Sequence, residues 1–318
     1  MDFIITVDVE ADNQWKDEAP KTIDNVYALP RFHNLVRAFG FKPTYLISYE
    51  VANDAKAISM LKAWQDRGEA EIGAHLHPWS TPPYGELDQN HKRFPSELKD
   101  IELNQKLVTL TIKIKETTGK WPTSYRAGRW GFDERQSAIL KELGYKVDCS
   151  ITPKVSWSSS SREPGKNGPD WTKASVKPHR LPSGLIEVPM TILNTGLIKN
   201  EANWLSQLVL RLESGSLSRR IFNKLIFKQK WLRIFKESDS SNWEKIYQSA
   251  RISNLSVMEF MIHSSELVFG MSPYAKNEEE VESLYKNLDS MFSFFKIKGT
   301  SGITLESFCN KSDSKIKT

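Results

Sequence analysis

The sequence predicts an α/β protein in which parallel strands form a closed or nearly closed barrel, and three observations support this. Seven short apolar runs recur along the 318 residues. Helical patterns fill most of the gaps, and strands that alternate with helices of this length form mostly parallel sheets. Polar side chains follow or end several of the runs, as at the mouth of a barrel, where the strand ends carry the active site.

The elements follow one another in a regular order. The strands are expected at Phe3–Asp8, Pro43–Ser48, Glu71–His75, Ser124–Arg126, Lys146–Ser150, Leu185–Met190 and Val257–His263. Among the helices between them, one covers residues 95–117, one begins after the N-cap Asp133 and stops at Gly144, and a late one spans 281–295.

Two segments interrupt this order. Residues 152–184 form a loop rich in Ser, Gly, Pro and Lys, and loops of that length are typically functional or disordered. A helical insertion is expected from about 201 to 254. We therefore predict a single barrel over residues 1–309, followed by a polar tail at 310–318.

The net charge of +5 is concentrated in one stretch, because residues 219–236 contain basic side chains and no acidic one. An outer helix with a solvated basic face is one interpretation. An interfacial helix that meets anionic lipid or a lipid-linked sugar is the other. Nucleic-acid binding is not expected, since no recognition motif accompanies the stretch.

Composition and the N-terminal residues indicate where the protein works. No apolar run approaches the roughly 18 residues of a membrane span, and the sequence MDFIITVDVE lacks the basic region of a secretory signal. We expect a cytoplasmic protein, with peripheral contact at the inner membrane through residues 219–236. Cys149 and Cys309 are expected to be reduced and buried.

Three acidic residues alternate in TVDVEAD, at the end of the first strand. Asp8, Glu10 and Asp12 share one face if the chain is extended. Carboxylates this close repel one another unless a cation compensates them. A solvated strand end is one explanation; a metal ligand beside a general base is the other, and the electrostatic cost favours it.

The stretch IGAHLHPW places His75 and His77 on one face of another strand end. Two imidazoles and a carboxylate leave a metal with room for water, which is the layout of a catalytic site. His33 and His91 lie without carboxylate neighbours and are interpreted as structural.

Two further strand ends carry polar residues. SYRAGRWGFD supplies Arg126 and Arg129, and a guanidinium can hold a catalytic carboxylate in its ionised form. His263 ends the apolar run 257–262, where it is either a structural residue or a general acid.

These motifs, in this order, resemble the polysaccharide deacetylases of the NodB-homology type (carbohydrate esterase family 4), from Thr6 to about Ser307. The resemblance implies a distorted (β/α)7 barrel, similar to a TIM barrel, and one divalent metal per chain, most often Zn²⁺. It implies that Asp8 is the general base and His263 the acid, that Arg126 steadies the base, and that Asp148 in VDCS acts near the site. The metal ligands would then be Glu10, His75 and His77.

The sequence departs from the family pattern at three places. The second acidic residue of the first motif, Glu10, is displaced by one position and is Glu instead of Asp. The histidines are two residues apart instead of four, so either His77 is the second ligand from a different loop or His75 binds alone. Gly128 stands where the arginine motif usually has proline. Asp12 is an alternative ligand to Glu10.

The expected function is metal-dependent removal of an N-acyl group, most often acetyl, from an amino sugar during surface-polysaccharide biosynthesis. The substrate would be a nucleotide- or lipid-linked sugar of an O-antigen, capsule or exopolysaccharide, and the side chains expected to contact it are Trp15, Trp79, Arg129 and Trp130. Two alternatives are a hydrolase of formamides or other non-peptide amides on the same barrel, and a carbohydrate-binding protein without catalysis.

Overall fold

The computed structural model describes residues 1–14, 16, 22–85, 93–161, 165–199, 226, 228–235 and 240–312. Its strands are β1 (Asp2–Val9), β2 (Thr44–Ile47), β3 (Glu71–Leu76), β4 (Ser124–Ala127), β5 (Val147–Asp148), β6 (His179–Arg180), β7 (Ile186–Glu187), β8 (Ile192–Asn194), β9 (Gln229–Trp231), β10 (Val257–His263) and β11 (Ser301–Gly302). Its α-helices are α1 (Leu29–Ala38), α2 (Tyr49–Ala52), α3 (Ala55–Asp66), α4 (Asp100–Thr118), α5 (Glu134–Glu142), α8 (Ser240–Ile252), α9 (Glu278–Ile297) and α10 (Leu305–Ser312). Short 3-10 helices are η1 (Asp24–Ala28), η2 (Pro95–Glu97), η3 (Gly128–Trp130), η4 (Ser158–Ser160) and η6 (Ser264–Leu267).

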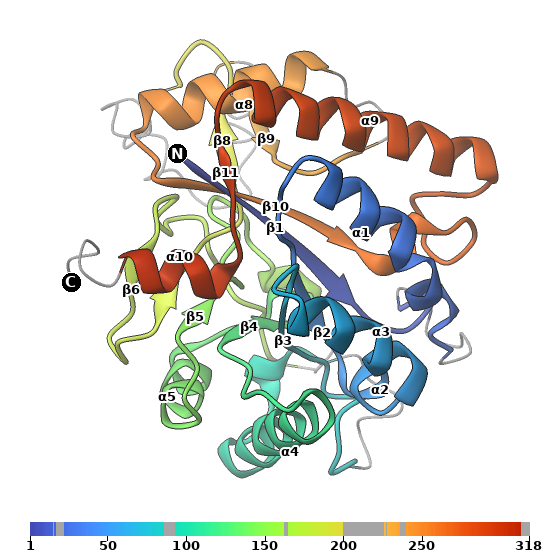
Figure 1. Ribbon diagram of the computed structural model, residues 1–318. Coiled ribbons are helices and arrows are strands. Elements are labelled where there is room, and N and C mark those ends of the chain that lie inside the picture. The colour runs from blue at the N-terminus through green and yellow to red at the C-terminus, as the bar shows by residue number, and fades with distance from the viewer. Residues whose placement is uncertain are drawn as a thin grey trace.

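All seven expected strands are present, and they form one parallel sheet in the order β10-β1-β2-β3-β4-β5-β7. β6 adds to β7 in the antiparallel direction, and the short β11 pairs with β1. The sheet curls as in a barrel (Figure 1). Among the described strands, β10 and β6 are its two edges and do not pair with each other, so the barrel is open. The predicted fold class, a distorted α/β barrel, is confirmed.

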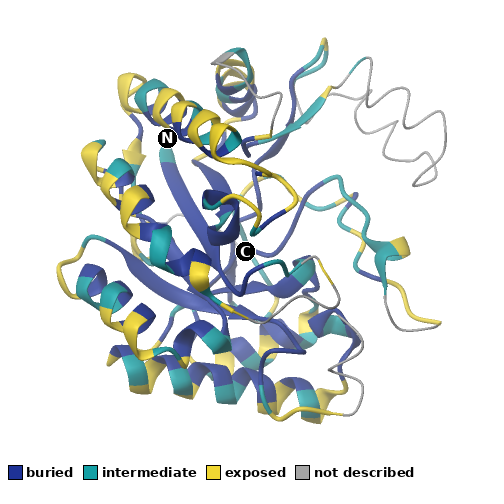
Figure 2. Ribbon diagram, turned by 90° about the vertical axis from the view of Figure 1, so that its right-hand side faces the viewer, coloured by how far each residue is buried: buried dark blue, intermediate teal, exposed yellow. Residues whose placement is uncertain are grey.

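Helices cover the outside of the curled sheet and turn their apolar faces inward (Figure 2). In α4 the apolar residues of the buried face are Leu103, Leu107, Leu110 and Ile114. Ile101, in the first turn of this helix, is 75% exposed. The N-cap predicted at Asp133 is confirmed, because its side chain accepts a hydrogen bond from the backbone N–H of Gln136.

A C-terminal helix contributes to a second, smaller core cluster. Leu305, Phe308 and Cys309 of α10 belong to the same buried cluster as Ile4 of β1 and Val147 of β5. The helix continues to Ser312, and Lys311 Nζ lies 2.9 Å from Asp2 Oδ1. Residues 310–312, which were predicted to belong to a polar tail, are therefore part of this helix, and residues 313–318 lie outside the described part of the chain.

The helical insertion predicted over residues 201–254 is partly wrong. Residues 200–225 lie outside the described part of the chain, and residues 240–252 do form α8, but residues 229–231 are strand β9. β9 pairs with β8 in an antiparallel hairpin, in which Ile192 faces Trp231. Leu232, which directly follows this strand, is fully buried in the core. Within the described residues, no helix combines the length and apolar character that crossing a membrane requires.

Candidate functional site

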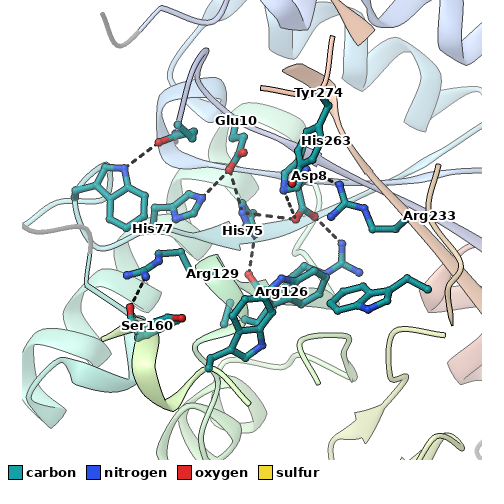
Figure 3. A pocket seen from close by; sticks show the side chains of 17 residues that line it. Asp8, Glu10, His75, His77, Arg126, Arg129, Ser160, Arg233, His263 and Tyr274 are labelled. Carbon is teal, nitrogen blue, oxygen red and sulfur yellow. Dashed lines mark hydrogen bonds and ion pairs between the residues drawn. The ribbon is translucent and has the colours of Figure 1, made fainter. Parts of the chain in front are cut away.

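The polar residues singled out in the sequence gather around one cavity of about 360 Å³ at the carboxyl ends of the strands (Figure 3). Cavities of this size, with aromatic walls and a few convergent polar groups, are typical of ligand sites. The predicted residues that line it are Asp8, Glu10, His75, His77, Trp79, Arg126, Arg129, Trp130 and His263.

Strand register explains why these residues meet. Asp8 of β1 is the direct partner of His263 of β10, although 254 positions separate them in the chain. His75 of β3 is likewise the direct partner of Arg126 of β4. Because parallel strands expose their carboxyl ends at the same edge, residues that end different strands converge there.

Glu10, His75 and His77 are buried and form a compact group of possible metal ligands, whose ligand atoms lie within 4.8 Å of one another. Glu10 Oε2 is 2.7 Å from His77 Nε2 and 3.4 Å from His75 Nε2. The Nδ1 of His75 lies 3.1 Å from the backbone oxygen of Arg126, which directs the other ring nitrogen toward Glu10.

This donor set fits a divalent metal. Two imidazole nitrogens and one carboxylate oxygen are the protein ligands of many catalytic zinc sites, and they leave positions for water and substrate. Burial lowers the pKa of His77, together with the charge of His75, so this imidazole is neutral and has a lone pair to offer. Both histidines of the HxH pair therefore belong to the candidate metal site.

Asp12, the alternative ligand, lies elsewhere. Its carboxylate accepts hydrogen bonds from Thr22 Oγ1 (2.6 Å), the backbone N–H of Asp24 (2.8 Å) and both the backbone and side-chain N–H groups of Asn25 (3.0 and 2.6 Å). Asp24 and Asn25 are the first residues of η1, and Thr22 lies two residues before it. Asp12 therefore organises this turn, and the structure favours Glu10 as the ligand.

Asp8 has one oxygen fixed and the other turned toward the histidines. Arg126 Nη1 donates to Asp8 Oδ1 at 2.7 Å. Asp8 Oδ2 lies 3.8 Å from His75 Nε2 and 3.9 Å from His263 Nε2. Burial raises the pKa of Asp8, but the charges of Arg126 and the two histidines outweigh burial and hold the pKa below its usual value. Asp8 is therefore an ionised carboxylate.

Arg126 is itself held in a buried network. Its side chain is 1% exposed; Nη2 donates to Thr6 Oγ1 at 2.9 Å and to the Glu259 carboxylate, and Nε donates to the backbone oxygen of Cys149 at 3.0 Å. Thr6 Oγ1 also donates to Glu259 Oε1 at 2.7 Å. Every nitrogen of this guanidinium is engaged, so its position relative to Asp8 is fixed.

His263 is oriented by a carboxylate three residues later. Glu266 Oε1 lies 2.7 Å from His263 Nδ1 and accepts a hydrogen bond from the backbone N–H of His263 at 3.0 Å. Burial raises the pKa of Glu266, but the charge of Arg233 and the hydrogen bond to His263 outweigh burial and hold the pKa below its usual value. The ionised Glu266 therefore favours a proton on Nδ1 and leaves Nε2 facing Asp8.

Asp148 does not line the cavity, and its predicted role at the site stays a prediction. It is fully buried and pairs in register with Tyr125 and Glu187 instead of Arg126. Its carboxylate accepts from the hydroxyl of Ser150 at 2.6 Å. Burial raises the pKa of Asp148, and the charge of Arg126 partly opposes the shift.

Aromatic side chains form much of the cavity wall. Trp79 packs on His77, with ring centroids 4.3 Å apart, and its indole N–H donates to Gln14. Arg129 and Trp130 both have left-handed backbone angles, with φ of 56° and 64°. Such angles cost energy for non-glycine residues and are concentrated at functional sites. The predicted contact residue Trp15 lies outside the described part of the chain, as does His91.

Several site residues were not predicted. Trp231, Arg233 and Tyr274 line the cavity. Glu259 binds Arg126, and Glu266 binds His263. Two signals were available in the sequence: Glu259 is an acid inside an apolar strand, which requires a buried partner, and Glu266 follows His263 at the spacing of one helical turn. Trp231 and Arg233 alternate, as expected for a strand, but were assigned to a helix.

Known proteins share this fold but not this sequence. No family model matches the chain, and no curated protein matches it either. A solved protein from Mycobacterium smegmatis, assigned as a polysaccharide deacetylase, is similar with a TM-score of 0.60 at 13% identity, over 99% of this chain and 91% of that one. Puue allantoinase is similar with a TM-score of 0.51 at 11% identity, over 99% of this chain and 90% of that one. At these identities the likeness is one of fold.

Proposed function

We propose that the protein is a metal-dependent hydrolase that removes the N-acyl group, acetyl in the first instance, from an amino sugar. One observation carries the proposal: the donor set Glu10, His75 and His77 adjoins an ionised Asp8 on one side, and His263 lies on the far side of Asp8. The likeness of fold to an assigned polysaccharide deacetylase and the motif resemblance support the same chemistry.

Glu10, His75 and His77 would hold the metal, which when bound supplies a more acidic water and polarises the amide carbonyl. The residues around it move the protons. Asp8 takes a proton from the attacking water through Oδ2, while Arg126 keeps Oδ1 in place. His263, when it carries a proton on Nε2 as well as on Nδ1, gives the Nε2 proton to the leaving nitrogen as the C–N bond breaks, which yields a carboxylic acid and a free amine.

The test is hydrolysis of N-acetylated amino sugars, followed as release of acetate and of a primary amine in equal amounts. Asp8→Asn keeps the shape of the side chain but not its basicity, so it should reduce kcat by about 10²–10⁴-fold while metal stays bound. Full activity in Asp8→Asn would refute the assigned base. A metal-bound protein that binds acylated sugars without hydrolysing them would favour the non-catalytic alternative.

A second candidate keeps the site and changes the substrate. Puue allantoinase is named for a small ureide substrate and shares the fold, so formamides and other small non-peptide amides form the alternative class. Product analysis separates the two: release of acetate from acetylated sugars supports the first candidate, whereas release of formate or cleavage of ureides alone supports the second.

The cellular context is a further part of the proposal. We place the substrate among nucleotide- or lipid-linked intermediates of surface-polysaccharide biosynthesis, with the basic residues 219–236 at an anionic membrane surface. Residues 219–225, 227 and 236 lie outside the described part of the chain. Binding to liposomes that contain anionic lipid, and its loss on charge reversal of Lys224, Lys228 and Lys230, tests this placement.

A further inference from the structure

Arg233, which lies outside the parallel sheet, contacts Glu266, the carboxylate that orients His263. Arg233 follows β9 of the β8–β9 hairpin, and its Nη2 donates to Glu266 Oε1 at 2.6 Å. Arg233 is 7% exposed and Glu266 is 2% exposed, so water screens their attraction little. The hairpin is thereby connected to the carboxyl end of β10.

The same oxygen of Glu266 serves three donors. It accepts from Arg233, from the backbone N–H of His263 and from the ring at Nδ1 of His263 (2.6, 3.0 and 2.7 Å). Without Arg233, Glu266 would be a buried carboxylate with no guanidinium to balance its charge, and such a group shifts or takes up a proton. Either change would release Nδ1 of His263.

We propose that Arg233 is a positioning residue for His263, and that the β8–β9 hairpin completes the site through the chain of contacts Arg233–Glu266–His263. Arg233 acts by keeping Glu266 ionised and in place, which fixes the ring tautomer and the direction of Nε2. The inference rests on the proposed function for the role of His263 as the acid, but not for the contacts themselves.

Kinetics of three variants test the proposal. Arg233→Ala should lower kcat by about 10²-fold with little change in KM, because misplacing a reacting group by about 1 Å has an effect of that size. Arg233→Lys should restore part of the loss, and so should added guanidinium ion with Arg233→Ala. The matched control is Lys199→Ala, which removes a positive charge from the chain that follows β8 but contacts Gln248 instead of Glu266.

A double variant separates a direct role of Arg233 from one through Glu266. If Arg233 acts only through this carboxylate, Arg233→Ala combined with Glu266→Gln should be no slower than Glu266→Gln alone. Arg233 Nη2 also lies 3.3 Å from His263 Nδ1, so additive losses would assign its role to that direct contact. A raised KM with unchanged kcat would make Arg233 a substrate contact. Either result would overturn the proposal.

A measurement without turnover keeps this test distinct from that of the proposed function. Nitrogen NMR shifts of the His263 ring should report a proton on Nδ1 in the wild-type protein and a mixture of tautomers in Arg233→Ala. The same tautomer in both proteins would overturn the proposal even if the enzyme is active. A change of tautomer in a protein that hydrolyses no amide would support the positioning role and count against the proposed function alone.

Discussion

Gly128 and His77 are in such close contact that a side chain at residue 128 would occupy the space of the imidazole. A β-carbon built on Gly128 would lie 2.2 Å from His77 Nδ1 and 2.5 Å from the backbone oxygen of Leu76. The glycine and the two-residue histidine spacing, both departures from the family pattern, are therefore one coupled feature. A larger residue at 128 excludes a histidine at 77 in this position.

Gly128→Ala should therefore displace His77 and weaken metal binding by about 10–100-fold, the range seen when groups that orient a ligand are lost. Competition with a chelator of known affinity measures this effect. Gly68→Ala is the control: a β-carbon there meets nothing within 4 Å, so its effect is confined to backbone strain at φ +67°. Equal metal affinity in Gly128→Ala and the wild type would contradict the coupling.

Lys106 of α4 stabilises the loop that follows His77 by hydrogen bonds to its backbone. Its fully buried Nζ donates to the backbone oxygens of Pro78, Thr81 and Pro83 at 2.9, 2.8 and 2.7 Å. Lys106→Met leaves these acceptors without their donor and should lower the free energy of unfolding by about 3 kcal/mol, with weaker metal binding as a consequence. Urea unfolding measures the loss. Lys113→Met, on the same helix, should change neither quantity by a comparable amount, and equal effects would contradict the assignment.

The two acidic residues that the sequence could not separate should behave differently. Glu10→Gln should abolish stoichiometric metal binding, because it replaces a ligand oxygen that faces both imidazoles. Asp12→Asn should keep the metal but destabilise the fold by about 1–3 kcal/mol, because a carboxylate that accepts four hydrogen bonds is lost. Metal loss in Asp12→Asn at a temperature where the variant is folded would reverse this assignment.

Much of the fold could be predicted from the sequence because buried parallel strands produce continuous apolar runs, which mark their own position. All seven strands were found this way, and the polar residues at the ends of β1, β3, β4 and β10 meet at one cavity. The hairpin was missed because β8 and β9 have only three residues each, so their alternation is too short to outweigh the helical pattern of the surrounding chain.

The site was predicted less completely, because strand register and long-range side-chain contacts cannot be read from a local sequence pattern. Asp148 was placed near the reacting groups on the basis of its motif, but register pairs it with Tyr125. The contact between Arg233 and Glu266 joins an irregular segment to a strand end, and no local pattern specifies such a pair. In contrast, Asp8, Glu10, His75 and His77 lie at the carboxyl ends of strands or directly after them, so the direction of the strands was enough to bring them together.

His33 gives the folded protein a defined dependence on pH. It is fully buried, stacks on Trp64 at 3.9 Å and lies 3.0 Å from the hydroxyl of Tyr45. Burial lowers the pKa of His33 from 6.5 to about 4, although Glu69 partly opposes the shift. The unfolded chain then binds a proton more readily than the folded one, so the free energy of unfolding should fall as the pH drops from about 6.5 to about 4.

Denaturant unfolding of the wild type and His33→Gln across pH 4–7.5 measures this contribution. The variant should be less stable at pH 7, where it lacks the stacked ring, but should lose less stability on acidification. Parallel curves for the two proteins would show that His33 does not titrate in the way its burial implies.

Elemental analysis of protein purified without a histidine tag or added metal tests most directly whether Glu10, His75 and His77 hold a catalytic metal. We expect close to one zinc or other divalent ion per chain in the wild type and none in a His75→Ala, His77→Ala double variant. Absence of metal from the wild-type protein, even after incubation with zinc, would contradict this expectation, as would equal metal content in the double variant.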